Sequence, residues 1–315
     1  MTSMKSVEIL FGSDGKLRSG WRFTIFILGF IFAGLVIGTA VVAALVGISK
    51  ETAPGTSTFF VVNGLVSLFV ALLIGWLCGK YLEGLPFTAL GAGFLKGWWL
   101  RFVLGLLIGV LTFSLAAVIG IAAGGLSFQL NADASRSSIL TTLIVSFLIF
   151  AAAAAFEEAL FRGYILQTFI RSEMTWFGVL LTSTLFATVH NANPSANLFS
   201  WLNTFVAGIW FSVAYLRSRD LWLPFGLHLA WNWTQGSIFG VEVSGITEIV
   251  KAPMMRETDI GPAWITGGDY GIEGGIITTI ALIVSATAIY FIPFSGRISV
   301  STDYKLGADP TSSGS

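Results

Sequence analysis

Long apolar stretches, separated by short segments that carry most of the charges, dominate the hydrophobic pattern of this chain. A helix needs about 20 mostly apolar residues to cross the hydrocarbon core of a bilayer. Eight stretches are candidates for such spans, with boundaries good to a few residues: 21–48, 56–78, 98–123, 138–170, 176–190, 198–216, 221–240 and 272–294. The pattern predicts an all-α fold, a polytopic bundle of about eight transmembrane helices.

The fourth stretch differs from the others in length. Residues 138–170 would extend about 50 Å at the helical rise of 1.5 Å per residue, which is too long for one straight span. We therefore expect this helix to tilt, to break or to project beyond the bilayer.

Composition supports a membrane protein. Of the 315 residues, 55% are hydrophobic and 11% are charged, whereas about a quarter of the residues of a soluble domain are charged. Lys and Arg balance Asp and Glu at 17 each, so no basic surplus indicates nucleic acid as a partner. The one cysteine, Cys78, excludes an internal disulfide and a cysteine-based zinc site.

The basic residues test the alternation of loops that eight spans require, because cytoplasmic loops are enriched in Lys and Arg. Only four of the 17 basic residues fall on one side, namely Lys50, Arg136, Lys251 and Arg256. We therefore expect both termini in the cytoplasm. The predicted organisation is a cytoplasmic segment 1–20, helices 1–3 in 21–137, a helical core 138–240, an acidic extracytoplasmic loop 241–271, a last helix 272–294 and a flexible tail 295–315.

Charged side chains inside the spans are functional candidates, because a charge at mid-bilayer costs about 2.5–3.5 kcal/mol. Glu157, Glu158 and Arg162 follow a run of alanines that permits close helix packing. Glu158 and Arg162 are spaced i, i+4 and share a helix face, whereas Glu157 points about 100° away. A structural ion pair with an acid near the membrane surface is the alternative interpretation of this motif alone.

The chain contains only two histidines, His190 and His228. His190 ends the pattern Phe186-Ala-Thr-Val-His190, and His228 shares a helix face with Asn232. Each histidine alone is compatible with hydrogen bonding between helices. Measured from the predicted cytoplasmic turns, however, Glu157 and His190 lie about 20 Å and His228 about 14 Å along their helices. This similar depth favours one shared site, which we expect to open towards the cytoplasm.

The residue types define two chemical possibilities. Glu157 in an apolar site suits a general base that activates water, with His190 orienting that water. His228 and Asn232 could donate to the oxyanion that forms when water attacks a carbonyl group. Alternatively, Glu157, His190 and His228 could hold a divalent metal such as zinc, although no His-Glu-x-x-His pattern occurs. The sequence leaves both possibilities open.

At these motifs the chain resembles the CPBP family of intramembrane proteases, the CAAX-processing and bacteriocin-processing or Abi proteins, which include type II CAAX prenyl endopeptidases. The resemblance extends from about residue 138 to residue 240. The family's Glu-Glu-x-x-x-Arg, Phe-x-x-x-His and His-x-x-x-Asn motifs match, in order and without departure, Glu157, Glu158 and Arg162, then Phe186 and His190, then His228 and Asn232.

The resemblance implies an intramembrane endopeptidase for a peptide or membrane-protein substrate. It implies that Glu157 is the base, that His190 positions the water and that His228 and Asn232 form the oxyanion site, with Glu158 and Arg162 in support. Segment 15–22 looks like the N-terminal pattern of many bacterial members, which implies a multi-pass protein of a bacterial inner membrane. The alternative is a non-catalytic scaffold or immunity protein of this type that binds a partner.

Overall fold

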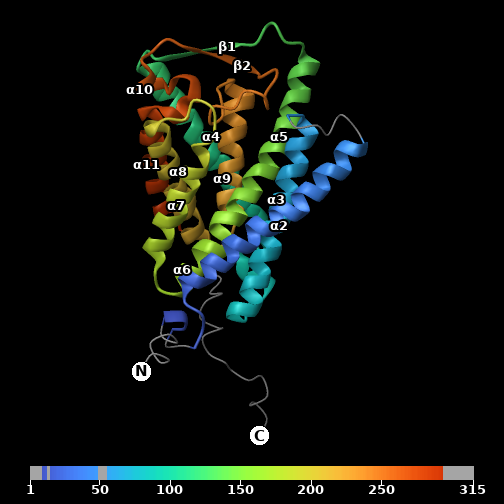
Figure 1. Ribbon diagram of the computed structural model, residues 1–315. Helices are drawn as coiled ribbons and strands as arrows, with labels where there is room; N and C mark the ends of the chain where they lie inside the picture. The colour runs from blue at the N-terminus through green and yellow to red at the C-terminus, as the bar shows by residue number, and fades with distance from the viewer. Residues whose placement is uncertain (1–8, 13–14, 49–54, 294–315) are drawn as a thin grey trace.

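The computed structural model describes residues 9–12, 15–48 and 55–293, and it is mostly helical (Figure 1). The predicted tail 295–315 lies outside these residues. The α-helices are α2 Ser19–Ile48, α3 Ser57–Cys78, α4 Trp98–Ala122, α5 Arg136–Glu158, α6 Leu166–Arg171, α7 Thr175–His190, α8 Leu198–Ser218, α9 Trp222–Trp233, α10 Ala263–Thr266 and α11 Ile276–Phe291. Short π-helical turns are η2 Gly79–Glu83, η4 Ala159–Ile165 and η5 Thr234–Phe239, and 3-10 turns are η3 Phe87–Leu90, η6 Gly268–Tyr270 and η7 Ile272–Gly274.

Each of the eight apolar stretches forms a helix, but the helices differ in length. Within the described part of the chain, five are long and apolar enough to cross a membrane: Ser19–Ala44, Ser57–Glu83, Trp98–Ala122, Arg136–Arg171 and Leu198–Ser218. Helices α7, α9 and α11 have 16, 12 and 16 residues. The chain is therefore a helical membrane protein with five candidate spans, and the count of eight crossings stays a prediction.

The long fourth stretch breaks, which is one of the three outcomes that its length led us to expect. Helix α5 continues through the π-helical turn η4 into α6, and Gly163 inside η4 has φ −70° and ψ −107°, which is not helical. A π-helical turn inserts an extra residue into the helix and often marks a functional site. Here it begins directly after Glu158.

The two ends of the molecule are different. At the end that we call the turn end, Glu83 accepts hydrogen bonds from Arg22 at 2.9 Å and from Arg171 at 2.8 Å. These contacts join the start of α2 to the end of α6. Helix α2 begins and α11 ends at this same end (Figure 1). This placement agrees with termini on one side of the membrane, and their cytoplasmic location stays a prediction.

At the opposite end, which we call the strand end, two short strands pair. Strands β1 Leu126–Leu130 and β2 Met255–Asp259 are antiparallel, with Leu126 opposite Asp259. The prediction of an all-α fold was therefore incomplete, because the mostly helical chain also contains this small sheet. The sheet escaped prediction because its strands are only five residues long and because their partners lie more than a hundred residues apart in the sequence.

Glycines allow α9 to pack closely against α4. A Cβ atom on Gly105 would lie 2.3 Å from the carbonyl oxygen of Leu223, and one on Gly226 would lie 2.3 Å from that of Phe102. Small residues permit such backbone approach between helices in membranes. This contact holds α9, and with it His228, against the bundle.

Candidate active site

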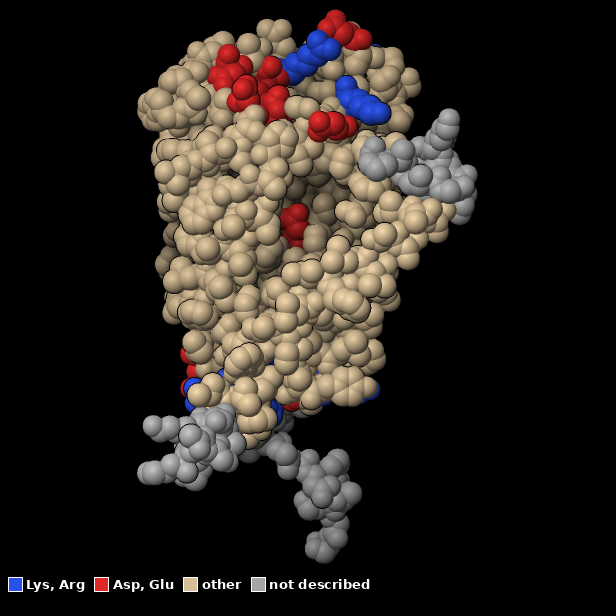
Figure 2. All heavy atoms as spheres, viewed as in Figure 1, with Lys and Arg blue, Asp and Glu red and all other residues tan. Residues whose placement is uncertain are grey.

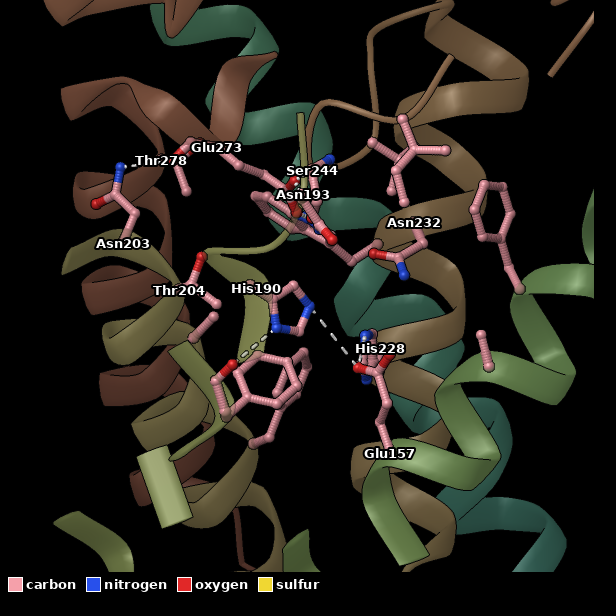
Figure 3. Close-up of a pocket in the computed structure, with 18 of the residues that line it drawn as sticks. Glu157, His190, Asn193, Asn203, Thr204, His228, Asn232, Ser244, Glu273 and Thr278 are labelled. Atoms are coloured by element: carbon pink, nitrogen blue, oxygen red, sulfur yellow. Dashed lines mark hydrogen bonds and ion pairs between the residues drawn. The ribbon is translucent and has the colours of Figure 1, made fainter. Parts of the chain in front are cut away.

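The four residues predicted for catalysis line one pocket. Its volume is about 240 Å³, and Glu157, His190, His228 and Asn232 all contribute to its wall. They come from α5, α7 and α9, so the structure brings together three separate helices (Figure 3). Figure 2 shows the surface hollowed near the middle of the molecule, with an acidic side chain visible inside the hollow.

Glu157 faces both histidines. Its Oε2 atom lies 4.0 Å from Nε2 of His190 and 3.7 Å from Nε2 of His228. Oε2 is buried and accepts no hydrogen bond from the protein, while the side chain as a whole is 23% exposed. The distances are longer than direct hydrogen bonds and suit contacts that a water molecule bridges.

His228 is held in a defined orientation between the two glutamates. Its Nδ1 atom lies 2.9 Å from Oε1 of Glu158, and its ring stacks on Phe211 with centroids 4.4 Å apart. An Nδ1–H that donates to the Glu158 carboxylate leaves Nε2 directed at Glu157. The two neighbouring glutamates therefore lie at opposite edges of one imidazole ring.

Arg162 neutralises Glu158. The arginine is fully buried, donates to Oε1 of Glu158 at 3.1 Å and donates to the carbonyl oxygen of Gly208 at 2.9 Å. Its guanidinium carbon also lies 4.9 Å from the ring centre of Phe186, a contact that favours a cation. A buried charge is tolerated only when it is paired and hydrogen-bonded, so this ion pair supports the ring orientation of His228.

His190 is oriented by its own helix. Its Nδ1 atom lies 2.7 Å from the carbonyl oxygen of Phe186, one turn earlier in α7. A carbonyl oxygen only accepts, so Nδ1 carries the proton and the lone pair of Nε2 points towards Glu157. The Phe-x-x-x-His spacing thus supplies the oxygen that selects the tautomer.

The three candidate metal ligands, Glu157, His190 and His228, face one another. Among the residues that the structure describes, no group of three His, Cys, Asp or Glu side chains meets the geometry of a metal site. Ligands that lie about 2.0–2.2 Å from a tetrahedral zinc are about 3.4 Å from each other, and the separations of 3.7 and 4.0 Å around Glu157 exceed this by a few tenths of an ångström. Activation of water by Glu157 alone and a metal-held water therefore both stay predictions.

The pocket contains further polar residues that the motifs do not include. Asn193, Asn203, Thr204, Ser244, Glu273 and Thr278 also line it (Figure 3). Sequence reasoning missed Glu273, although this acid lies inside the predicted span 272–294 and an intramembrane charge is itself a signal. In the structure it precedes α11, which begins at Ile276.

The pocket extends in one direction along the helices. From Glu157 it extends towards the strand end, where Asn193, Ser244 and Glu273 line it. The expectation that the site opens towards the cytoplasm stays a prediction, since it depends on the orientation of the chain in the membrane. Depth along a helix locates a residue but does not tell on which side the cavity opens.

Comparison with known proteins supports the resemblance seen in the motifs. Residues 139–234 match the model of a family described as Rce1-like, type II CAAX prenyl endopeptidase Rce1-like. The matched stretch contains all three motifs. The resemblance to CAAX-type intramembrane proteases is thereby confirmed for this part of the chain, and at the level of the family it indicates a hydrolase.

A curated protein of Escherichia coli, described as an uncharacterized 24.3 kDa protein, is 38% identical over 115 residues. The match covers 36% of this chain and 50% of that protein, so the chain spans about half the length of the relative. The activity, substrates and partners of the whole chain are therefore proposals.

Proposed function

We propose that the protein is an intramembrane endopeptidase that hydrolyses a peptide bond with water activated by Glu157. The observation that carries this proposal is the position of Oε2 of Glu157, which faces Nε2 of two oriented histidines across 3.7 and 4.0 Å. A carboxylate oxygen that accepts no hydrogen bond from the protein and lies beside two oriented imidazole rings is an arrangement that suits a general base for water.

In the first step, Glu157 takes a proton from a water molecule that Nε2 of His190 helps to position. The water oxygen attacks the carbonyl carbon of the substrate and the carbonyl π electrons move onto its oxygen. When this tetrahedral intermediate collapses, the C–N bond breaks and Glu157 returns the proton to the leaving nitrogen. The immediate products are a carboxylic acid and an amine, which become a carboxylate and an ammonium group when the acid proton passes to the amine, so atoms and charges balance with water as the one co-reactant.

His228 and Asn232 supply the donors for the oxyanion. Doubly protonated, His228 donates through Nδ1 to Glu158 and through Nε2 to the substrate oxygen. The amide of Asn232 lies one turn further along α9 and lines the same pocket. Glu158, with its charge neutralised by Arg162, keeps the imidazole in place. Loss of one oxyanion donor typically lowers kcat by about 100- to 1,000-fold.

The variant Glu157→Gln tests the proposal because it preserves the shape of the side chain and removes the base. New protein N-termini in membranes that contain the wild-type chain should be absent from membranes with the variant, with an expected rate loss of about 100- to 10,000-fold. Glu248 is an exposed acid in the segment 241–275 at the strand end. Glu248→Gln makes the same chemical change there and should leave cleavage intact. The Glu157→Gln variant should also bind its substrates without cleaving them, so that the bound substrates can be purified with it and identified.

Cleavage that persists in folded Glu157→Gln would contradict the proposal and favour the scaffold alternative. Elemental analysis of active protein, with His190→Ala as the comparison, tests metal dependence separately. Full activity without stoichiometric metal agrees with activation of water by Glu157 alone. Metal that is stoichiometric and disappears with His190 would replace this mechanism by a metal-dependent one.

A further inference from the structure

A second carboxylate lies in the pocket with Glu157. Glu273 comes from η7, before α11, and Figure 3 shows it on the strand-end side of His190. The proposed hydrolysis does not use this residue. It also lies outside residues 139–234, the stretch that matches the family model.

Three hydrogen bonds hold the carboxylate of Glu273. Nε1 of Trp231 donates to Oε1 at 2.9 Å, while the backbone N–H and the hydroxyl of Ser244 donate to Oε2 at 2.6 and 2.8 Å. All three partners act as donors, which suits an ionised carboxylate. A carboxylate offers about four acceptor positions, so capacity remains for one further donor.

The pocket offers no lysine or arginine to balance this charge, and all of its lining residues belong to the described part of the chain. The two histidines among them face Glu157. Glu158 differs in this respect, because Arg162 pairs with it. The nearby Tyr270 adds no charge, since burial, together with the charge of Glu273, raises the pKa of its hydroxyl to about 12. In the proposed mechanism a doubly protonated His228 lies beside Glu157, so Glu273 is the carboxylate of the pocket that has no cationic side chain of the described residues beside it.

The surrounding segment has the same sign of charge. Residues 241–275 contain six acidic side chains, among them Glu273, and only two basic ones. Figure 2 shows acidic side chains gathered on the strand end above the hollow, with a few basic ones beside them. Clefts lined by one sign of charge raise the local concentration of ligands of the opposite sign.

We propose that Glu273 binds a cationic group of the substrate, a Lys or Arg side chain or a free α-ammonium group, and so determines which peptide bond is cut. This inference rests on the proposed endopeptidase function. Glu157 and Glu273 line the same pocket, so a peptide that reaches both carboxylates has its cation close to the bond that faces Glu157.

Peptide binding to the full-length chain with Glu157→Gln tests this role without turnover. The probes are acetylated pentapeptides, Ala-Leu-X-Leu-Ala, with a C-terminal fluorophore and with X as Lys, Arg, Gln or Glu. A fifth probe has X as Gln and a free N-terminus. At low ionic strength the Lys and Arg probes, or the probe with the free N-terminus, should bind about tenfold more tightly than the acetylated Gln probe. The probe that gains affinity identifies the source of the cation.

Adding Glu273→Gln should reduce this preference to less than about twofold. Ser244→Ala is the matched control, because it removes one donor to Glu273 and preserves the charge, so the preference should persist. Equal binding of all probes, or a preference that survives Glu273→Gln, would overturn the inference.

The comparison of the Lys, Gln and Glu probes remains informative if the protein with Glu273→Gln does not fold. In that case the Glu probe should bind the Glu157→Gln protein most weakly, and added salt should remove the differences in affinity between the probes. A Glu probe that binds as well as the Lys probe would overturn the role of Glu273. Failure of the wild-type chain to cleave any protein would instead overturn the proposed function, so the two failures are distinguishable.

Discussion

The pocket is built from two regions with different physical character. The helical region, α5, α7 and α9, supplies Glu157, His190, His228 and Asn232. It orients His190 by an i, i+4 contact and His228 by the buried pair of Glu158 and Arg162. The strand-end segment 241–275 supplies its lining from short turns, held mainly through the carboxylate of Glu273. The candidate chemistry and the candidate selectivity therefore reside in separate regions, and only the first lies in the stretch that matches the family model.

The largest effect should follow from removing the buried cation of the helical region. Arg162→Met leaves Glu158 buried without its counter-charge, and breaking a buried pair in this way costs about 3–5 kcal/mol. We expect a large loss of thermal stability in detergent and of folded protein in membranes. Thermal unfolding of the purified protein measures the change.

The double variant Glu158→Gln with Arg162→Met provides the control. It removes both charges, so it should be more stable than Arg162→Met alone. Equal stability of the single and double variants would show that the ion pair does not hold this region together, and would weaken the contrast with the strand-end segment.

Two asparagines of the pocket sharpen the comparison. Asn232→Ala should lower kcat by about 100-fold or more with little loss of stability, because the residue acts on the oxyanion. Asn203 donates to the backbone oxygens of Glu273 and Gly275, each at 2.8 Å. Asn203→Ala should therefore lower the thermal midpoint and change kcat much less. Turnover and unfolding measured on both variants test this, and a reversed pattern would contradict the assignment.

The smallest effect is expected for Glu257 in β2. Burial, with the nearby charges of Glu242 and Asp259, raises the pKa of this carboxyl from 4.5 to about 7. The folded chain therefore keeps the proton up to about pH 7, whereas the unfolded chain loses it above about pH 4.5. Stability of the strand end should fall as the pH rises between these values.

Glu257→Gln should abolish this pH dependence, which we expect to amount to less than about 1 kcal/mol because the side chain is partly exposed. Hydrogen exchange of the β2 amides at pH 5 and pH 8 measures it. Wild-type amides that are better protected at pH 8 than at pH 5 would contradict the sign.

The sequence was most informative where function follows helical spacing. The i, i+4 pairs Glu158–Arg162, His228–Asn232 and Phe186–His190 could be predicted, because a helix repeats every 3.6 residues whatever surrounds it. The length of the fourth stretch predicted a tilt, a break or a projection, and only the structure shows the break in η4. Glu273 was missed because its place in the pocket depends on hydrogen bonds from Ser244 and Trp231, which no local pattern links to it. The same holds for the β1–β2 sheet.

By itself, the sequence determined that the chain is a helical membrane protein and named the few polar side chains that its apolar helices carry, since hydropathy and helical period are local properties. Only the tertiary structure decided that Glu157 faces both histidines, that the pocket extends towards the strand end and that Glu273 joins it. The physical reason is that these relations depend on how helices pack and on where a distant segment folds back. The glycines of α4 and α9 allow that close packing. None of these three relations can be read from the spacing of residues along one helix.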